Sequence, residues 1–454
     1  MNNNKNTVIA VFVLCAFMLT ILSACNITQN DESSGWVVET VTTVVDSDSS
    51  DNNHTTTVES SSKKQNSSKN NKPISSNKTD SGKTNSTNAE ESIYTHCTKQ
   101  MLEKSIFFKG DNTRLASKIK AALKNKNSTT KIAFLGDSIT AGAVVDLGAM
   151  HYANIFADYW RENIGNKVNV NIQGYPATTS HLGVHIVEDV VLKDKPDIIF
   201  IEYVNDADGE QFTLNCIDSL LRKCLSLDNK PAVILLEMSY HGTTNAQNTH
   251  YKAAKEYGVP MISWQNALRL PMINGDIKWS DVSPDEVHPN KMGHRMLAEM
   301  MWYYTDLVLP TASAAKEPAA FNIAAVTDDV YKNTKILDRT NLKPSDIGNF
   351  TESIEHGPFN NGWATTSGGS ITFKVTAMRI ALAYLSTEQY PNGKAEVYVD
   401  GKLASTITIA SASFTSIRTQ HLKSFKTLEE HTVTVKILEG TKDDFQILSL
   451  LIAQ

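Results

Sequence analysis

The sequence has few cysteines, no surplus of positive charge and only one long apolar run. Five cysteines are scattered over 454 residues, which is too few and too dispersed for a disulfide framework or a zinc site. The formal net charge is −6, whereas a protein that binds nucleic acid would need a basic face. Hydrophobic residues make up 41% of the chain, as in an ordinary globular protein. We therefore expect no nucleic-acid partner, no metal and no cofactor.

The one long apolar run lies at the N-terminus, at residues 8–22, between Lys5 and the segment Leu-Ser-Ala-Cys that ends at Cys25. A charge, an apolar run and small residues form an export signal. The cysteine after the small residues resembles the lipobox of bacterial lipoproteins, which implies that Cys25 is lipidated. We therefore expect an exported protein, anchored by lipid on the extracellular face of the cell membrane. Ordinary cleavage after Ala24, which would release the protein, remains the alternative.

Residues 26–92 are dominated by Ser, Thr, Asn, Asp and Lys. Such a segment cannot bury enough apolar surface to offset the entropy lost on ordering. The sequence therefore predicts a signal peptide over 1–25 and a disordered linker over 26–92. A flexible coil of that length has a root-mean-square reach of about 45 Å, which suits a tether.

Short apolar runs alternate with helical patterns over residues 93–312. The runs that predict strands are "KIAFLG", "KVNVNIQG", "PDIIFIEYV", "AVILLEMS" and "VPMISW". Helical periodicity covers 152–164, 212–227 and 245–257. Uncharged strands separated by helices indicate a doubly wound α/β domain with a parallel sheet covered on both faces.

The pattern changes to alternation after the bridge "PTASAAKEPAA". Segments such as "GSITFKVT" and "HTVTVKIL" predict strands, and "VDGK" predicts a hairpin turn. We therefore expect a C-terminal antiparallel β-sandwich over 313–454, joined to the α/β domain by few buried contacts. As a carbohydrate-binding module it would offer Trp363, Tyr390 and Phe359 for stacking, although core packing is the simpler use of each ring.

Four places in the α/β domain, which follow predicted strands or open predicted helices, hold residues that a buried strand edge does not need. Ser138 comes directly after "KIAFLG", where the next residues, 139–142, predict the start of a helix. Gly174 ends the second strand, Asn205 ends the third, and Asp285 precedes His288 by three residues in "SPDEVHPNKMGH". Because the carboxyl ends of parallel strands meet at one edge of a sheet, we expect these residues to converge there.

These residue types suit nucleophilic attack on an ester. A serine hydroxyl needs a base within hydrogen-bond reach, which His288 can supply, and Asp285 can fix the tautomer of its ring. The backbone N–H groups of Ser138 and Gly174 and the amide of Asn205 can receive the charge of an oxyanion. Each residue also has a simpler use, since serine caps helices, Asp-x-x-His can bind a metal, and Asn and Gly suit turns.

The four segments occur in the order and contexts of the blocks of the SGNH hydrolases, also called GDSL esterases, so residues 131–309 resemble that family. The most specific pairing is "GDSIT" with "DEVHPNKMGH". The resemblance implies a flavodoxin-like SGNH hydrolase fold with Ser138 as nucleophile and with Asp285 and His288 as its partners. It also implies an oxyanion hole formed by Ser138, Gly174 and Asn205. No Gly-x-Ser-x-Gly segment surrounds Ser138, which disfavours the ordinary α/β-hydrolase fold.

The remaining histidines and cysteines fit structural positions. Two cysteines in "TLNCIDSLLRKCLSL" are separated by eight residues, or about 12 Å of helix, which is too far for a disulfide. We interpret Cys216 and Cys224 as small core residues, and Cys97 is too far from both in the sequence to suggest a disulfide framework or a zinc site. His181 and His185 have the spacing of a helical metal pair but lack a third ligand, so we expect them at the surface or at a pocket rim.

The resemblance and the tether together predict an esterase that removes O-acetyl groups from a cell-wall or plant polysaccharide. Three alternatives remain open at this point. The first is a lipolytic esterase or lysophospholipase, although no long apolar lid segment is visible. The second is an O-acetyltransferase that uses the same residues, and the third is a glycan-binding lipoprotein without activity.

Overall fold

The computed structural model describes residues 93–243, 246–353, 355–387, 393–409, 414–438 and 445–454. The predicted signal peptide over 1–25, the lipidated Cys25 and the linker over 26–92 lie outside the described residues, as does Tyr390. None of the helices in the described ranges is long and apolar enough to span a bilayer.

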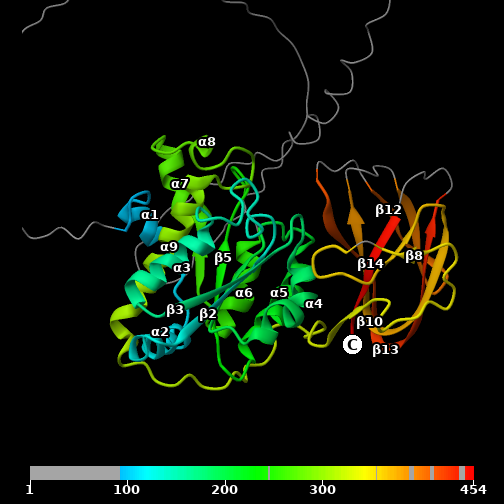
Figure 1. The fold of residues 1–454 in the computed structure, drawn as a ribbon, viewed down its shortest axis with the longest axis horizontal. Coiled ribbons are helices and arrows are strands. Elements are labelled where there is room, and N and C mark those ends of the chain that lie inside the picture. Colours follow the sequence, from blue (N-terminus) through cyan, green and yellow to red (C-terminus); the bar gives the residue numbers. More distant parts are fainter. Residues whose placement is uncertain (1–92, 244–245, 354, 388–392, 410–413, 439–444) are drawn as a thin grey trace, which may run out of the picture. The chain divides into compact units, whose positions relative to one another are not determined.

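The first domain is built on a mixed sheet (Figure 1). Its strands are β1 (Ile106–Phe108), β2 (Thr129–Gly136), β3 (Lys167–Gly174), β4 (Ile198–Glu202), β5 (Ala232–Glu237) and β6 (Met261–Ser263). The sheet order is β1-β6-β5-β4-β2-β3, with β2 to β6 parallel and β1 antiparallel to β6. The five predicted strands and their flavodoxin-like order are confirmed. The sequence does not reveal β1, because three half-buried residues are too short for a periodic signal.

Helices cover both faces of this sheet. They are α1 (Lys99–Ser105), α2 (Thr113–Lys124), α3 (Tyr152–Tyr159), the π-helix η1 (Trp160–Ile164), α4 (Ser180–Val190), the 3₁₀ turn η2 (Leu192–Asp194), α5 (Glu210–Leu225), α6 (Gln247–Tyr257), α7 (Trp264–Asn274), α8 (Trp279–Val282) and α9 (Lys291–Ala312). Alternate residues of each strand enter different cores. Phe134 packs with α3 and α9, whereas Leu135 packs with α4 and α5, as a doubly wound fold requires.

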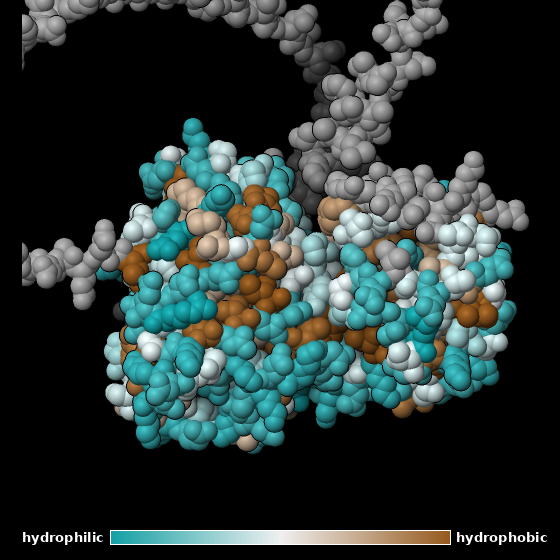
Figure 2. Space-filling view, viewed as in Figure 1, coloured by the Kyte–Doolittle hydropathy of each residue, from teal (hydrophilic) through white to brown (hydrophobic). Residues whose placement is uncertain are grey.

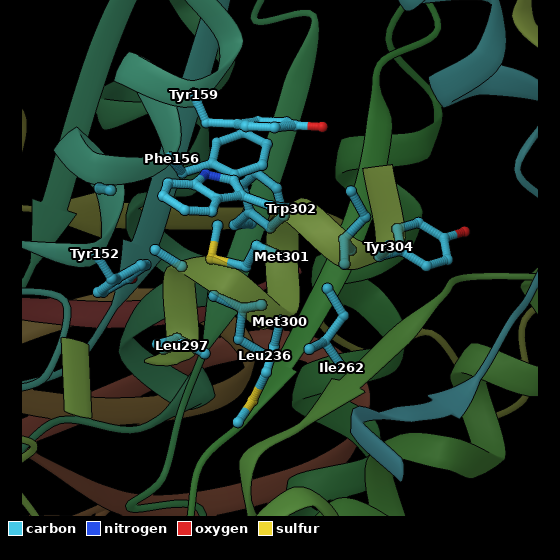
Figure 3. Packing of buried hydrophobic residues seen from close by; sticks show 14 of the residues in the cluster. Tyr152, Phe156, Tyr159, Leu236, Ile262, Leu297, Met300, Met301, Trp302 and Tyr304 are labelled. Carbon is cyan, nitrogen blue, oxygen red and sulfur yellow. The ribbon is translucent and has the colours of Figure 1, made fainter. Parts of the chain in front are cut away.

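Large aromatic and sulfur-containing side chains fill the core under α3 and α9 (Figure 3). The rings of Tyr159 and Trp302 stack with centroids 5.1 Å apart. Phe156 meets Phe200 of β4 edge to face, also at 5.1 Å. This packing holds α3 and η1 over the whole segment, 152–164, that the sequence predicts as a helix.

The second domain is an all-antiparallel β structure. Its strands are β7 (Thr334–Leu337), β8 (Thr351–Glu352), β9 (Trp363–Thr365), β10 (Gly369–Ser386), β11 (Lys394–Val399), β12 (Lys402–Thr408), β13 (Ser416–Ile437) and β14 (Phe445–Ala453). The order is β12-β11-β13-β10-β14-β9-β8, and β7 also pairs with β14. Bulges interrupt the pairing of the long strands β10 and β13, which increases their local bend and twist.

Two aromatic residues that the sequence offers for sugar stacking are buried in the structure. Trp363 is 1% exposed and packs edge to face on Phe373 inside the β domain. Phe359 is 2% exposed and belongs to the core between the domains. The stacking interpretation of these two residues is wrong, and core packing accounts for both.

The two domains share one buried apolar cluster, contrary to the expectation of few buried contacts. Leu182 of α4 and Leu214 of α5 belong to the same cluster as Ala383 of β10 and Leu451 of β14. Polar contacts border the cluster, including a hydrogen bond of 2.5 Å from Lys223 Nζ to Thr334 Oγ1. The composition of the connecting segment "PTASAAKEPAA" does not reveal this interface. The apolar residues that form the interface also fit the ordinary patterns of strands and helices within each domain.

The surface and the cysteines are ordinary for a globular protein. Hydrophilic residues cover most of the face shown in Figure 2, and apolar residues lie there in separate patches. Cys97, Cys216 and Cys224 are buried free thiols. The predicted role of Cys216 and Cys224 as small core residues is confirmed.

Candidate active site

Ser138 lies in a tight turn at the carboxyl end of β2, between β3 and β4. In an open α/β sheet, this point where the strand order reverses is where ligands bind. The helix predicted over 139–142 is wrong. Ala141 N–H donates to the Asp137 carbonyl at 2.9 Å, but Gly142 (φ 81°) and Val144 (φ 76°) are left-handed, so consecutive turns replace a helix. Ser138 therefore lies at the start of a run of turns and gains no helix dipole.

Ser138, His288 and Asp285 are joined by a continuous chain of hydrogen bonds. Ser138 Oγ lies 2.8 Å from His288 Nε2, and His288 Nδ1 lies 2.8 Å from Asp285 Oδ2. Because a carboxylate accepts at Nδ1, that nitrogen carries the proton and Nε2 is left to accept from the serine hydroxyl. The serine is 6% exposed, whereas the side chains of His288 and Asp285 are partly open to solvent.

The loop that carries the acid and the histidine is fixed by its own backbone. Asp285 Oδ1 accepts from the N–H groups of Val287 at 2.8 Å and His288 at 2.7 Å. Partial burial opposes ionisation of Asp285, but these backbone hydrogen bonds and the His288 ring outweigh it, so the pKa of the carboxyl is lowered. Asp285 is therefore an anion at neutral pH and holds the imidazole in one orientation.

Gly174, at the end of β3, pairs with Gly136 at the end of β2. Gly136 precedes Ser138 by two residues, so Gly174 lies beside the turn that carries the serine. A Cβ atom on Gly174 would come within 2.1 Å of the Ala141 nitrogen. The turn that carries Ser138 therefore presses against the backbone at Gly174, and only glycine fits there.

Asn205 is held against the carboxylate of Asp137, which precedes Ser138 in the chain. Its backbone N–H and its Nδ2 both donate to Asp137 Oδ2, at 3.2 Å and 2.9 Å. Asp137 is buried beside Glu202, and burial together with this second carboxyl raises the pKa of Asp137. Burial also raises the pKa of Glu202, whose Oε1 accepts from Val204 and Oε2 from Thr140. The two carboxyls thus avoid carrying full charge together.

Two residues of the site are absent from the sequence-based prediction. Tyr240 follows β5, and its hydroxyl donates to Asn205 Oδ1 at 2.6 Å. His250 of α6 bridges Asp206, at 2.9 Å, and Glu237, at 3.1 Å. No local motif marks either contact, although Glu202 and Glu237 at the ends of apolar strands are charged residues with no obvious reason to be buried.

Three histidines of the α/β domain, His181, His185 and His294, lie outside this constellation. His181 and His185 are 2% and 4% exposed, so their predicted surface position is wrong. Both pack on Tyr331 near the β domain, and burial lowers the pKa of His185 to about 4. His294 is buried and its Nδ1 accepts from the Tyr152 N–H at 3.1 Å. Within the described ranges no group of three or more His, Cys, Asp or Glu side chains is arranged to hold a metal ion.

This geometry suits acyl transfer chemistry. His288 Nε2 is placed to take the proton of Ser138 as the hydroxyl attacks a carbonyl, and Asp285 is placed to stabilise the imidazolium that forms. Asn205 lies at the same sheet edge as Ser138, where an amide donor can meet a developing negative charge.

Residues 134–296 match the GDSL-like lipase/acylhydrolase family. Among solved structures, a two-domain esterase active on acetylated mannans is 26% identical, with a TM-score of 0.70, over 78% of this chain and 98% of that chain. A second structure of that description, co-crystallised with mannopentaose, is 25% identical with the same TM-score and coverage. An acetyl xylan esterase is 20% identical over 38% of this chain and 98% of that chain, with a TM-score of 0.34. A comparison with curated proteins found no match.

Proposed function

We propose that this ester-bond hydrolase, whose catalytic domain is of the GDSL-like lipase/acylhydrolase family, removes O-acetyl groups from a polysaccharide of the mannan type. The observation that carries the proposal is the continuous chain from Ser138 Oγ through His288 to Asp285. The substrate class is supported by the similarity to an esterase active on acetylated mannans, which extends over both domains of this chain.

In the proposed reaction, Ser138 Oγ attacks the acetyl carbonyl carbon while its proton moves to His288 Nε2. The oxyanion receives hydrogen bonds from the N–H groups of Ser138 and Gly174 and from Nδ2 of Asn205. The C–O bond to the sugar breaks, and the sugar oxygen leaves with the proton from His288. Water then attacks the acetyl-serine with His288 as base, which releases acetate and restores Ser138.

The test compares acetate release from acetylated glucomannan, acetylated xylan and p-nitrophenyl esters of short and long acyl chains. We expect fast turnover of acetyl esters, with acetylated mannan preferred over xylan among polymers. Ser138→Ala should lower kcat by up to about 10⁶-fold, and Asp285→Asn by about 10⁴-fold. Asp281→Asn is the matched control, because Asp281 caps α8 in the same region through the Lys278 N–H. Full activity of Ser138→Ala would overturn the mechanism.

The same panel separates the alternatives. A lipolytic enzyme would prefer long acyl chains, and an acetyltransferase would move acetyl to an added oligosaccharide faster than to water. A glycan-binding protein without activity would bind mannan and release no acetate. The buried positions of Trp363 and Phe359 give this last alternative no stacking residue among the candidates that the structure describes.

The proposal includes an anchored location. Residues 1–25 carry the features of a lipoprotein signal and 26–92 those of a tether. A lipidated Cys25 would hold the enzyme at the outer face of the membrane, where a polymer too large to enter the cell is accessible.

A further inference from the structure

Asn205 has to present an amide hydrogen, and a side-chain amide can be turned in two ways. Rotation by 180° exchanges Oδ1 with Nδ2. The carboxyl oxygen Oδ2 of Asp137 lies 2.9 Å from Nδ2. The same oxygen accepts the Asn205 backbone N–H at 3.2 Å, so it is the accepting oxygen of this carboxyl group and pairs with a donor at this position. Asp137 therefore selects the orientation in which Oδ1 points away from it.

Tyr240 occupies the position that Oδ1 then faces. Its hydroxyl oxygen lies 2.6 Å from Oδ1, a short distance for two neutral groups. Burial and the nearby carboxyls of Asp137 and Glu202 raise the pKa of Tyr240, so the hydroxyl keeps its proton and donates it. Asn205 is thus held at both ends, and Nδ2 retains one hydrogen beyond the one given to Asp137.

Because of these contacts, we infer that Tyr240 is a positioning residue for the oxyanion hole, acting through Asn205. The inference rests on the proposed esterase function. A donor at Oδ1 draws electron density from the amide and makes the remaining Nδ2 hydrogen a stronger donor. It also removes the freedom of the amide to rotate, so the donor is already in place when charge develops on the substrate.

The backbone beside Tyr240 connects this arrangement to the catalytic loop. The His241 N–H donates to the Glu286 carbonyl at 2.8 Å, and Glu286 directly follows Asp285. The His241 ring stacks on Trp279, with centroids 5.1 Å apart, and Trp279 Nε1 donates to the Asp285 carbonyl at 2.5 Å. The segment that carries Tyr240 is therefore tied to the loop of Asp285 and His288, so both halves of the site keep a fixed separation.

The test is a double-mutant cycle on a small acetyl ester, with Tyr240→Phe, Asn205→Ala and the combined variant. Asn205→Ala should lower kcat by roughly 10²–10³-fold. Tyr240→Phe should lower kcat by about 3- to 10-fold and leave KM unchanged, because only a hydrogen bond to Asn205 is lost. In the Asn205→Ala background, Tyr240→Phe should have no further effect on kcat. Tyr240 is 37% exposed, so the fold should tolerate Tyr240→Phe. Equal thermal midpoints of the variant and the unmodified protein would verify this.

The matched control is Tyr398→Phe in the β domain, which also removes a tyrosine hydrogen bond of 2.6 Å, to Glu396. It should leave kcat and KM unchanged. The inference would be overturned if Tyr240→Phe lowered kcat by the same factor in the Asn205→Ala background as in the unmodified enzyme. It would also be overturned if Tyr240→Phe raised KM and left kcat unchanged. Either result would mean that Tyr240 acts on the substrate. Unchanged kinetics of Tyr240→Phe beside a large loss in Asn205→Ala would overturn it too, while the proposed esterase function would stand. An inactive wild type, by contrast, would refute the function itself.

Discussion

Asp206, the residue after Asn205, accepts a hydrogen bond from the buried ring of His250 at 2.9 Å. The other ring nitrogen of His250 lies 3.1 Å from Glu237 at the end of β5. Asp206 also accepts the Ser180 N–H at the start of α4 through its other oxygen, at 2.7 Å. The loop that carries Asn205 is thereby fixed to β5 and α6 through one charged histidine, and to α4 directly through Asp206.

The first prediction concerns stability at alkaline pH. Burial opposes the charge on His250, but Glu237 and Asp206 outweigh it and raise its pKa to about 10, against roughly 6.5 in an unfolded chain. The resulting stabilisation, on the order of a few kcal/mol, is fully present below pH 6.5 and is lost as the pH rises through 10. The free energy of unfolding from urea titrations should therefore fall between pH 7 and pH 10.

His250→Gln should remove most of this pH dependence and lower the thermal midpoint at pH 7 by roughly 5 °C, since two carboxyls lose their cation. His431→Gln is the control, because His431 pairs with Asp400 at 2.8 Å in the β domain. If both variants lost the pH dependence of the free energy of unfolding to the same extent, the pH dependence would not arise from His250.

The second prediction concerns the close approach at Gly174. Gly174→Ala should push the Ala141 turn away from β3, displace Ser138 and lower kcat by at least about 10-fold, because misplacement of 1 Å can cost 10²-fold. Gly148→Ala is the control, since a Cβ there meets nothing within 4 Å. Full activity of Gly174→Ala with an unchanged crystal structure would contradict the steric argument.

The third prediction concerns the boundary between the domains. A chain that ends at residue 312 exposes the apolar faces of α4 and α5 that Leu451 and its neighbours cover. We expect this fragment to aggregate or to lose activity on small esters, although it contains Ser138, Asp285 and His288. Size-exclusion chromatography measures whether the fragment aggregates, and turnover of p-nitrophenyl acetate measures its activity. A monomeric fragment with the full rate would show that the shared cluster is dispensable.

The fourth prediction concerns the anchor. Cys25→Ala should abolish incorporation of a labelled fatty acid and release the protein from the membrane fraction, as expected for a lipobox cysteine. Cys97→Ala serves as control because Cys97 is a buried thiol of the folded domain. Absence of label on the native protein would favour ordinary cleavage after Ala24.

The sequence predicts those parts of the fold and site that local pattern determines. Ser138, Gly174 and Asn205 each lie at or shortly after the end of an apolar strand. Asp285 lies three residues before His288, so a short segment is enough to mark each one. Tyr240 and His250 are invisible at that level, because each meets its partner only after β4, β5 and α6 are packed.

The errors of the sequence-based prediction have physical causes too. The helix expected over 139–142 fails because Gly142 and Val144 take left-handed conformations, which a β-branched residue such as Val144 rarely adopts. The histidines expected at the surface are buried because α4 lies under Tyr331, a residue of the connecting segment that no periodic pattern places there.

The shared cluster also sets an order of events during synthesis. Since β14 comes after the whole α/β domain in the chain and Leu451 is part of the core over α4, the α/β domain leaves the ribosome before its partner strand exists. Until then its apolar helices remain uncovered, a state in which chains aggregate or bind chaperones. The buried cluster that supports the serine site is therefore complete only after β14 has been synthesised.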